Sequence, residues 1–492
     1  MQLGKLIPGI DPALARINVA DIASDSREVV PGGLFLACAG SRDHGLRFLD
    51  DAIRHGARVV AWEPSRDLPP PELPADVDGF GVPGLRAQLG AIAGRFFAQP
   101  SSRLAIAGIT GTNGKTTVAW LVTQALEALG ERCGYIGTLG SGLGTSVRAD
   151  ELTTPGCVNL HRRLRILADG GARHVAAEVS SHALDQGRVS GVRFRVAAFT
   201  NLSRDHLDYH GDIASYGRAK ARLFADFAPP DAVINVGDAF GRSLASQLAA
   251  GTRLTAVALA GADTGALRPA LSIRRLGSHL DGQRIELIAG NDRFGFSTAL
   301  VGTFNLENLV VAAGILHALR FEPQAIAQAL AVCKAPPGRM EPVPAPAGPR
   351  VIVDFAHTPD ALSRALAVLT EDSEGEVWCV FGCGGERDGG KRPLMGDAAA
   401  AGSSHIVITD DNPRGEDPDA IVAAIRAGIP LGADVTVIRD RAAAIGHAIA
   451  SARPRDTVLI AGKGHESVQI VGREQRPFSD QQAARVALVQ RQ

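Results

Sequence analysis

A segment of small and polar residues around Lys115 has the composition of a phosphate-binding loop. It follows the apolar run Leu104–Ile109 and consists of Gly111, Thr112, Asn113, Gly114, Lys115, Thr116 and Thr117. Glycines let backbone N–H groups converge on phosphate oxygens, and the N-terminus of a following helix adds partial positive charge. Lys115 can reach the β- and γ-phosphates, and the Thr116 hydroxyl can coordinate Mg²⁺. The segment therefore predicts a nucleoside triphosphate site.

The strict Walker pattern is not met, because Ile109 stands where that pattern has its first glycine. The spacing is Gly-x-x-Gly-Lys-Thr instead. An ordinary strand–turn–helix corner is the alternative. The lysine and the two threonines at the expected places favour phosphate binding.

Carboxylates and imidazoles follow two further apolar runs. Glu178–His182 comes at the end of His174–Val179, and Thr200–Asp208 follows Val196–Thr200. A carboxylate at the end of such a strand lies where α/β sheets bind ligands and can hold Mg²⁺ through oxygen. A solvated strand end at Glu178, and a helix N-cap at Ser203 or Asp205, are the alternatives.

Lys220 lies in the helical pattern 216–224. Nothing in this pattern by itself distinguishes it from a surface lysine, which is the expectation from the residues alone.

Four charged loops follow predicted strands in the last third of the chain: Asp354–Asp360, Gly382–Arg392, Asp411–Arg414 and Gly462–Glu466. The carboxyl ends of the strands in such a sheet converge on one crevice, so we expect these loops to meet. Turn chemistry alone is the alternative, because Gly, Asp, Asn and Pro favour turns. Cys383 lacks partners for a metal site, and we expect it to pack in the core.

The elements that must position these residues fall into three blocks, 1–100, 101–335 and 336–492. Short apolar runs at Gly33–Ala39 and Ala57–Trp62 mark the first block. In the second, apolar runs alternate with helical segments such as Val118–Leu129, which predicts a mainly parallel sheet covered on both faces. The alternating segment Leu271–Val301 predicts antiparallel hairpins at the sheet edge. The proline-rich segment 334–350 predicts a linker.

The third block again alternates strands and helices, which predicts a second doubly wound α/β unit. The expected elements are strands 351–355, 377–381, 405–409 and 457–460 and helices 360–369 and 419–427.

Composition restricts the class of protein. Hydrophobic residues are 45% and charged residues 21% of 492, as in globular proteins. A formal net charge of -1 predicts no attraction to nucleic acid or to a membrane surface. The six cysteines are scattered, no apolar run reaches the roughly 18–20 residues of a membrane helix, and Met1–Asp11 does not resemble a secretion signal. A cytoplasmic location is expected.

Taken together, these motifs resemble the Mur ligases, which use ATP to extend the peptide of the peptidoglycan precursor. The resemblance covers nearly the whole chain and rests on the phosphate loop, Glu178–His182, Asn201–Gly211, Asp354–Leu362 and Gly382–Gly396. The loop of that family also lacks the first Walker glycine. The resemblance implies three domains: a smaller N-terminal α/β domain (1–100) that binds a UDP-sugar, a central ATP-binding domain (101–335), and a C-terminal Rossmann-like domain (336–492) that binds an amino acid.

The resemblance also implies roles for single residues. Besides the loop from Gly111 to Thr117, the positions that match contacts to ATP are Asn305, Arg339, Asp354, His357 and Lys391. Thr116 and Glu178 match ligands of one Mg²⁺, and His206 and Lys220 match ligands of a second. Lys220 aligns with a lysine that the family carries as a carbamate (N6-carboxylysine), and Lys115, His206 and Lys220 match the catalytic positions.

Substrate contacts are implied in the same way. The UDP-sugar positions are Ser24, Ser26, Ser41, Arg42 and Asp43, and the muramoyl-peptide positions are Thr153, Thr154, Ser180, Gln186 and Arg188. Ser41–His44 is less typical of the family, and Glu386 stands where aspartate is common.

The implied reaction joins meso-2,6-diaminopimelate to UDP-N-acetylmuramoyl-L-alanyl-D-glutamate through an acyl-phosphate. Diaminopimelate and L-lysine differ by one distal carboxylate, which Arg414 can bind in a bidentate pair. The positions implied for the amino acid are Arg392, Asp411, Asn412, Pro413, Arg414, Gly462 and Glu466. The partners are then small molecules, with no nucleic acid and no membrane insertion, and we expect a monomer.

Three other functions compete with this interpretation. Folylpolyglutamate synthetase is a related ligase, but it would not account for the first block or for Asp411–Arg414. A P-loop NTPase that drives a conformational change would hydrolyse ATP without any amino acid. A binding or scaffold protein on a decayed ligase fold would not need Lys115, Glu178, His206 and Lys220 together.

Overall fold

The computed structural model describes residues 1–40, 43–66, 68–150, 152–279, 282–345 and 347–491. The chain divides into two compact units. One comprises Met1–Ile273, Leu287–Asp292 and Glu307–Leu330, and the other comprises Arg274–Glu286, Arg293–Leu306 and Ala331–Gln492. Across the described ranges, no helix combines the length and apolar character that a membrane span needs.

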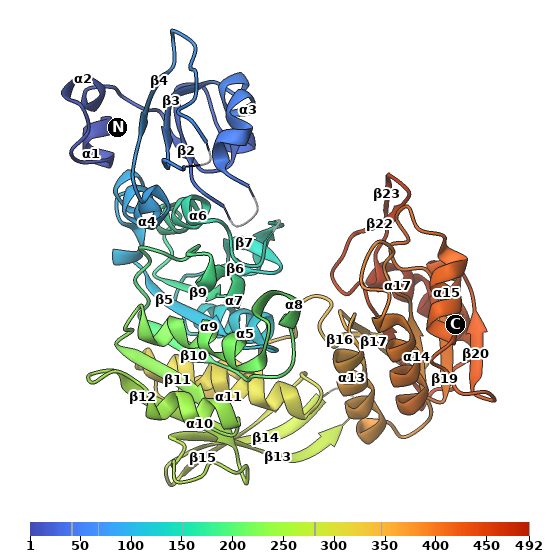
Figure 1. Ribbon diagram of the computed structural model, residues 1–492. Coiled ribbons are helices and arrows are strands. Elements are labelled where there is room, and N and C mark those ends of the chain that lie inside the picture. Colours follow the sequence, from blue (N-terminus) through green and yellow to red (C-terminus); the bar gives the residue numbers. More distant parts are fainter. Residues whose placement is uncertain (41–42, 67, 151, 280–281, 346, 492) are drawn as a thin grey trace. The chain divides into compact units, whose positions relative to one another are not determined.

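The first unit begins with a four-stranded parallel sheet in the order β1-β2-β3-β4 (Figure 1). Side chains alternate across a strand, so Leu34 and Leu36 of β2 enter one core cluster while Phe35 and Ala37 enter another. Its strands are β1 (Ile22–Ala23), β2 (Gly33–Ala37), β3 (Ala57–Trp62) and β4 (Asp78–Gly81). Its α-helices are α1 (Leu3–Leu6), α2 (Pro12–Ala15), α3 (Leu49–Arg54) and α4 (Leu85–Phe96).

The central sheet has the order β15-β14-β13-β12-β11-β10-β5-β9-β6-β7-β8. In this order, every neighbouring pair from β13 through β5 to β6 is parallel. Strands β7 and β8 then add an antiparallel edge beside β6. The strands are β5 (Ala105–Thr110), β6 (Cys133–Gly137), β7 (Gly140–Leu143), β8 (Ser146–Arg148), β9 (His174–Glu178), β10 (Val196–Phe199), β11 (Asp231–Asn235), β12 (Arg253–Leu259), β13 (Leu271–His279), β14 (Gly282–Ala289) and β15 (Asp292–Thr298).

Strand β5 lies between β9 and β10, and this order decides where the site forms. The phosphate loop leaves the end of β5, Glu178 ends β9, and the segment from Thr200 follows β10. Because the three strands are parallel neighbours, their carboxyl ends bring these segments to one edge of the sheet.

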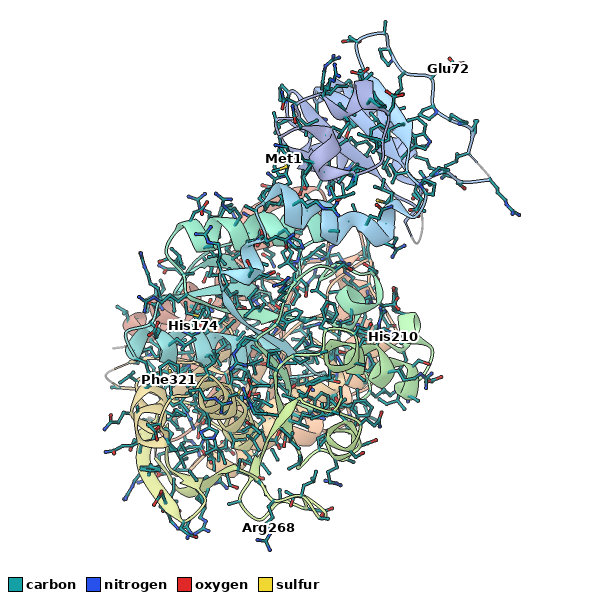
Figure 2. The ribbon with its side chains drawn as sticks, turned by 90° about the vertical axis from the view of Figure 1, so that its left-hand side faces the viewer. Met1, Glu72, His174, His210, Arg268 and Phe321 are labelled. Atoms are coloured by element: carbon teal, nitrogen blue, oxygen red, sulfur yellow. The ribbon has the colours of Figure 1, made fainter. Side chains whose placement is uncertain are left out.

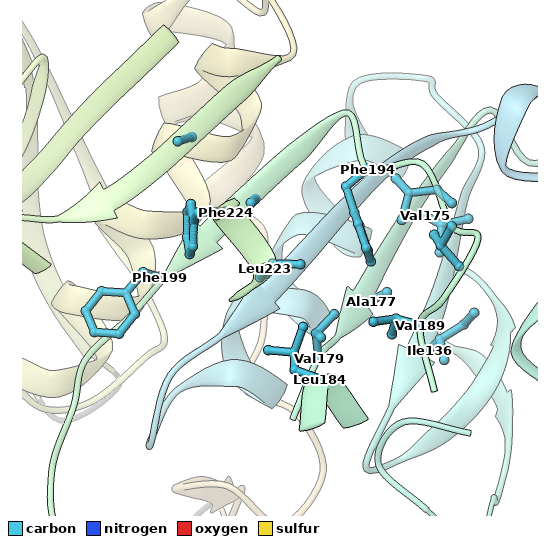
Figure 3. Close-up of a cluster of buried hydrophobic side chains, with 14 of the residues drawn as sticks. Ile136, Val175, Ala177, Val179, Leu184, Val189, Phe194, Phe199, Leu223 and Phe224 are labelled. Atoms are coloured by element: carbon cyan, nitrogen blue, oxygen red, sulfur yellow. The ribbon is translucent and has the colours of Figure 1, made fainter. Parts of the chain in front are cut away.

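Apolar side chains from the sheet and its helices fill the core of the first unit (Figure 3). Val175, Ala177 and Val179 alternate along one face of β9 and its end, and Leu223 and Phe224 enter the same cluster from α9. The helices are α5 (Lys115–Ala128), α6 (Cys157–Asp169), α7 (Ser181–Asp185), α8 (Leu207–His210), α9 (Ile213–Ala225), α10 (Ala239–Ser246), α11 (Thr303–Ala318) and α12 (Pro323–Ala331).

The second unit contains a six-stranded sheet in the order β16-β17-β21-β18-β19-β20. All pairs are parallel except β16 with β17, and a separate antiparallel hairpin joins β22 and β23. The strands are β16 (Glu341–Val343), β17 (Arg350–Asp354), β18 (Val377–Phe381), β19 (His405–Ile408), β20 (Asp434–Val437), β21 (Thr457–Ala461), β22 (Val468–Val471) and β23 (Glu474–Pro477). The helices are α13 (Pro359–Asp372), α14 (Lys391–Gly402), α15 (Pro418–Arg426), α16 (Arg441–Ser451) and α17 (Asp480–Gln490).

The α/β fold class and the strand and helix positions expected from the sequence are confirmed, with ends displaced by a few residues. The segment 271–301 does form strands at the edge of the central sheet, although Asp281 lies outside the described residues. The sequence analysis missed β6 with the hairpin β7–β8, and also β20 and the hairpin β22–β23. These strands are short and rich in glycine or polar residues, so they lack the apolar run that indicates a buried strand.

His405, at the start of β19, lies between two carboxylates. Its Nδ1 donates to Oδ2 of Asp434 at 2.5 Å and its Nε2 to Oε2 of Glu376 at 3.2 Å, and its ring stacks on Trp378 with 4.0 Å between centroids. Partial burial lowers the pKa of His405, but the hydrogen bonds to Asp434 and then Glu376 outweigh it and raise the pKa above 6.5. The folded protein therefore favours the imidazolium.

We expect His405 to stabilise the fold at acidic pH. A raised folded pKa gives a contribution that is complete below the unfolded pKa and is lost as the pH rises through the folded pKa. Melting temperatures of the wild type and His405→Gln should differ most at about pH 5.5 and least at about pH 8.5. A difference that stays constant over this range would contradict the assignment.

Candidate active site

The phosphate loop is braced by the segment that follows β10. The Thr200 hydroxyl donates to the carbonyl of Asn113 at 2.6 Å, and the N–H of Asn113 donates to Oδ1 of Asn201 at 3.0 Å. Gly114, the residue before α5, has φ +84°, and a Cβ there would collide with Oδ1 of Asn308. Glycine is needed at this position both for its backbone conformation and for the close approach of Asn308.

Two lysine side chains meet on the carbonyl oxygen of Gly111. Lys115 donates from Nζ to Gly111 at 2.9 Å and to the carbonyl of Thr112 at 2.8 Å. Lys220 donates from Nζ to the same Gly111 carbonyl at 2.7 Å. Both amino groups thus lie at the turn that the sequence predicts for phosphate binding.

Lys220 is 1% exposed, so the surface position expected from the residues alone is wrong. Helix α9 buries Tyr216, Lys220 and Leu223 on one face, and the Lys220 ammonium lies 4.1 Å from the centre of the Tyr216 ring. Burial, and next the nearby Lys115 ammonium, hold the pKa of Lys220 well below its usual value, against the opposing effect of Asp205. The spacing 216, 220 and 223 is helical and could have indicated burial.

Glu178 is 1% exposed and accepts four hydrogen bonds, which excludes a solvated strand end. Its Oε1 accepts from the Tyr135 hydroxyl at 2.7 Å and the Thr138 N–H at 2.9 Å. Its Oε2 accepts from the hydroxyls of Thr116 at 3.0 Å and Thr138 at 3.1 Å. The carboxylate is therefore fixed against the first turn of α5.

His206 lies in a group of aromatic rings beside Lys220. Its ring is 4.8 Å from His182 and 6.0 Å from Tyr216, and its Nε2 lies 3.5 Å from Oδ2 of Asp205. His210, which is labelled in Figure 2, belongs to the same group, and its ring lies 5.4 Å from that of His182. His206 itself precedes α8 with φ +52°, so the expectation of an N-cap at Ser203 or Asp205 is wrong.

A cavity of about 1050 Å³ lies in the first unit and includes five of the ten positions matched to the UDP-sugar and peptide. The matched residues that line it are Ser24, Ser26, Asp43, Gln186 and Arg188. Ser41 and Arg42 lie outside the described residues. Nearby, Thr154 accepts from Arg188 through its carbonyl at 3.2 Å and donates from its hydroxyl to the carbonyl of Glu178 at 2.8 Å, which links the cavity to the phosphate site.

The remaining peptide positions, Thr153 and Ser180, also lie between the cavity and the phosphate site. The Thr153 hydroxyl is 3.1 Å from that of Thr138, and the Ser180 hydroxyl accepts from the N–H of Ala183 at the start of α7.

Arg86 of α4 is a cavity residue that the sequence analysis missed. Its guanidinium donates to the carbonyls of Ala39 at 3.2 Å and Gln186 at 3.5 Å. Like Arg188, Arg86 forms no ion pair with a carboxylate in the described ranges, whereas Arg27 is paired with Asp25. The cavity lining also includes carboxylates such as Asp43 and Glu63, so the two guanidinium groups without an acidic partner are the local positions that could contact an anionic group.

In the second unit, the four charged loops meet at the carboxyl edge of the sheet, as the sequence predicts. The N–H of Gly462 donates to the carbonyl of Asp354 at 3.1 Å, and Lys391 donates to the carbonyl of His357 at 2.9 Å. A Cβ on Gly462 would touch Oδ2 of Asp411, and one on Gly382 would touch the N–H of Asp411. Cys383 packs in the adjacent core cluster, which confirms its expected role.

The residues matched to ATP contacts in this unit form one group, apart from Asn305. The guanidinium of Arg339 lies 4.6 Å from the centre of the Phe355 ring, and His357 lies 4.5 Å from that ring. Asp354 accepts the N–H of Met340 at 2.7 Å, and burial raises its pKa although Arg339 opposes the change. Asn305 is buried and donates to the carbonyl of Val301 at 2.8 Å.

The two arginines matched to the amino acid differ in their partners. Arg392 forms a bidentate pair with Glu416 at 2.6 and 2.7 Å, and this pair lowers the pKa of Glu416 to about 2. Arg414 has φ +53°, and its guanidinium donates to the carbonyls of Gly385 at 2.9 Å and Asn412 at 3.4 Å. Within the described ranges no carboxylate pairs with Arg414, so its charge is available to a ligand.

Asn412, Lys463 and Glu466 form a closed hydrogen-bonded group next to Arg414. Lys463 donates to Oδ1 of Asn412 at 3.0 Å and to Oε2 of Glu466 at 2.9 Å, and Nδ2 of Asn412 donates to the same Oε2 at 2.9 Å. Pro413, the residue between Asn412 and Arg414, is buried. Asn412 thus connects the two charged groups, since its side chain donates to Glu466 and its carbonyl accepts from Arg414.

A buried ion pair contacts the end of β21, two residues before Lys463. Arg441 of α16 binds Asp480 of α17 at 2.7 and 2.8 Å, with both side chains fully buried, and also donates to the carbonyl of Ala461 at 2.9 Å. Burial raises the pKa of Asp411, and the charges of Arg441 and Lys463 oppose this effect. Neither Arg441 nor Asp480 lies in a recognisable motif, so only the tertiary structure identifies them.

A phosphate loop, a braced carboxylate and a charged cavity on a P-loop-type α/β unit, in a chain that also forms a second Rossmann-like unit, define the class of ATP-dependent ligases. Two family models match the chain: the Mur ligase middle domain over residues 109–316 and the Mur ligase glutamate ligase domain over residues 338–464. The chain belongs to the Mur ligase family.

Individual proteins agree with this membership. UDP-N-acetylmuramoyl-L-alanyl-D-glutamate–2,6-diaminopimelate ligase of Alkalilimnicola ehrlichii is 48% identical over 478 residues, which is 96% of this chain and 95% of that protein. A solved structure of a ligase of the same name is 33% identical, has a TM-score of 0.71, and is matched over 100% of this chain and 99% of its own. Folylpolyglutamate synthase of Mycobacterium tuberculosis shares the fold, with a TM-score of 0.60 and 20% identity over 76% of this chain and 92% of its own.

Proposed function

We propose that the protein is the ATP-dependent ligase that adds meso-2,6-diaminopimelate to UDP-N-acetylmuramoyl-L-alanyl-D-glutamate in peptidoglycan precursor synthesis. The observation that carries the proposal is the meeting of Lys115 and Lys220 on the Gly111 carbonyl, beside the bonded pair Thr116 and Glu178. The relative of Alkalilimnicola ehrlichii that carries this name is 48% identical over nearly the full length of both chains.

In the first step, a carboxylate oxygen of the D-glutamate residue attacks the γ-phosphorus of ATP. The new bond joins this oxygen to phosphorus, the bond from phosphorus to the bridging β–γ oxygen breaks, and ADP leaves. Two anions must approach each other, so the reaction needs positive charge at the phosphate. Lys115 supplies it, because its present acceptors are two loop carbonyls that phosphate oxygens can replace.

The residues around Glu178 fit a magnesium ion. Thr116 and Glu178 contribute oxygens 3.0 Å apart, and such hard oxygen donors are the ligands that Mg²⁺ prefers. When bound there, the ion would screen charge on the phosphate oxygens. Tyr135 and Thr138 hold the Glu178 carboxylate in place for this role.

Lys220 fits conversion to a carbamate. Its neutral amine reacts with CO₂ to form an N–C bond and releases one proton, which turns a cation into an anionic oxygen ligand. Burial, the adjacent Lys115 ammonium and the absence of a carboxylate partner in the described ranges all favour the uncharged amine. The carbamate would join His206 in holding a second magnesium ion, since both side chains face the Tyr216 ring.

In the second step, the uncharged amine of the amino acid attacks the acyl carbon and forms the C–N bond. The bond from this carbon to the phosphate oxygen breaks, phosphate leaves, and the nitrogen loses one proton as the amide forms. The charges of the second unit favour diaminopimelate for this step. Arg414 has no acidic partner among the described residues, and Glu466 lies in the neighbouring group, so a distal carboxylate and a distal ammonium each meet a complementary charge. Bound L-lysine would leave the Arg414 guanidinium without a partner.

The cavity of the first unit is proposed as the UDP-sugar site. Its volume of about 1050 Å³ suits a nucleotide-sugar, and Arg86 and Arg188 offer charge to its anionic groups. We place the protein in the cytoplasm as a monomer, and its six free cysteines agree with a reducing compartment.

Phosphate release tests the proposed reaction. We expect the wild type to release phosphate only when ATP, magnesium, UDP-N-acetylmuramoyl-L-alanyl-D-glutamate and diaminopimelate are all present. Lys115→Ala should lower the rate by about 10³-fold or more, because it removes charge at the transferred phosphoryl group. Release without any amino acid would indicate an NTPase instead, and a normal rate for Lys115→Ala would refute the proposal.

Lys220→Ala should lower turnover as strongly, and a short carboxylic acid added to the assay should restore part of it. Intact-protein NMR with ¹³CO₂ should show a carbamate carbon in the wild type and none in Lys220→Ala. Lys220→Arg is the matched control, because it keeps the charge but cannot form the carbamate. If Lys220→Arg turned over normally, the carbamate assignment would be wrong.

Arg414→Ala should reduce the preference for diaminopimelate over L-lysine, by roughly 10²-fold or more in kcat/KM, since a charge-assisted bidentate pair is lost. The KM for ATP should stay the same. Arg426→Ala at the end of α15, which has no role in the proposed site, serves as the control. Unchanged selectivity in Arg414→Ala would exclude the arginine as the source of specificity.

A further inference from the structure

Lys463 is a fully buried lysine that the proposed reaction does not use. It is 0% exposed, and its two hydrogen bonds go to Oδ1 of Asn412 and Oε2 of Glu466. A buried ammonium is costly unless it is paired and hydrogen-bonded, so a position that only fills space would favour an apolar residue. The lysine must therefore serve the groups that it contacts.

The first of these groups is the amide of Asn412. Its Oδ1 accepts from the Lys463 ammonium at 3.0 Å and from the N–H of Ile470 at 2.9 Å, while its Nδ2 donates to Glu466 at 2.9 Å. Both donors at Oδ1 exclude the flipped amide, because a flipped Asn412 would turn its NH₂ group toward two other donors. Lys463 thus fixes the direction in which Asn412 presents its NH₂ group.

The second group is the carboxylate of Glu466, and its two oxygens are used unequally. Oε2 accepts from both Lys463 and Asn412, at 2.9 Å each. Oε1 has no hydrogen bond to any residue in the described ranges, and about a third of the side chain is exposed. One oxygen is therefore anchored inside the protein while the other remains available at the surface of the site.

Another buried cation near Glu466 is Arg441, which pairs with Asp480. Arg441 donates to Asp480 and to the Ala461 carbonyl, and none of its hydrogen bonds in the described ranges goes to Glu466. Lys463 is consequently the cation that contacts the Glu466 carboxylate directly. Removing it would free both the carboxylate and the Asn412 amide to rotate.

We propose that Lys463 is a positioning residue that aims Oε1 of Glu466 at the distal ammonium of the amino-acid substrate. This inference rests on the proposed function, because it assigns a role within the amino-acid site. Lys463 does not touch the substrate in this arrangement. It acts through Glu466 and Asn412, and it should affect recognition of the ammonium but not of the distal carboxylate, which Arg414 binds.

Two ligands separate these effects. Diaminopimelate carries the distal ammonium, and 2-aminopimelate keeps the distal carboxylate but lacks that ammonium. We expect Lys463→Met to raise the KM for diaminopimelate by roughly 10- to 100-fold, the range for loss of a charged hydrogen bond. The inhibition constant of 2-aminopimelate and the KM for ATP should change by less than about 2-fold, since neither ligand uses the ammonium contact.

A double-mutant cycle tests whether Lys463 acts through Glu466. Glu466→Gln should raise the KM for diaminopimelate by itself, and adding Lys463→Met should have little further effect, because residues in one network are not additive. Lys463→Gln keeps one amide donor, and it is the second variant if Lys463→Met does not fold. His405→Gln, on β19, controls for a general loss of stability.

The outcomes separate failure of this inference from failure of the proposed function. A wild type without diaminopimelate-dependent phosphate release would refute the proposed function. With an active wild type, equal weakening of diaminopimelate and 2-aminopimelate, or a raised KM for ATP, would show that Lys463 only supports the fold. Additive effects of Lys463→Met and Glu466→Gln would also overturn the inference.

Discussion

The first unit depends on one electrostatic arrangement, in which two lysine ammonium groups share the carbonyl oxygen of Gly111. Like charges at such close range repel, and Lys220 is also deprived of water. The arrangement is favourable when Lys220 is uncharged or when an anion joins the pair. Both conditions agree with the proposed function, in which phosphate oxygens bind at this turn and Lys220 reacts as an uncharged amine. Repulsion from Lys115 lowers the pKa of Lys220, and the proposed carbamate requires this uncharged amine.

The backbone holds this arrangement rigidly because three neighbouring strands converge on it. β5 brings the loop, β9 brings Glu178, and β10 brings the segment that braces Asn113 through Thr200 and Asn201. Glu178 needs its four donors because a buried carboxylate is stable only when its hydrogen-bonding capacity is filled. These hydrogen bonds hold the loop and the carboxylate in fixed positions, as the proposed reaction requires of preorganised groups.

In the second unit, some charged side chains form ion pairs with each other and others do not. Arg392 is neutralised by Glu416, and Arg441 by Asp480, so these pairs contribute structure. Arg414 is left without an acidic partner among the described residues, and Glu466 is left with one oxygen unused by them. The ion-paired residues hold the structure together. Arg414 and Glu466 carry opposite charges, which complement those of a zwitterionic group. The proposed preference for diaminopimelate rests on these two groups and not on the number of charges in the unit.

Sequence alone determined the α/β class, most strands and helices, and the loops that carry chemistry, because apolar runs and glycine-rich turns are local patterns. It also indicated the phosphate loop and Arg414 by motif. Only the tertiary structure decided that Lys220 and Glu178 are buried, since burial depends on segments far apart in the chain. The partners of these residues, such as Tyr135 and Thr138 for Glu178, and the pairs Arg392–Glu416 and Arg441–Asp480, could not be predicted for the same reason. Hydrogen bonds between distant residues follow from strand order, and no local pattern in the sequence records that order.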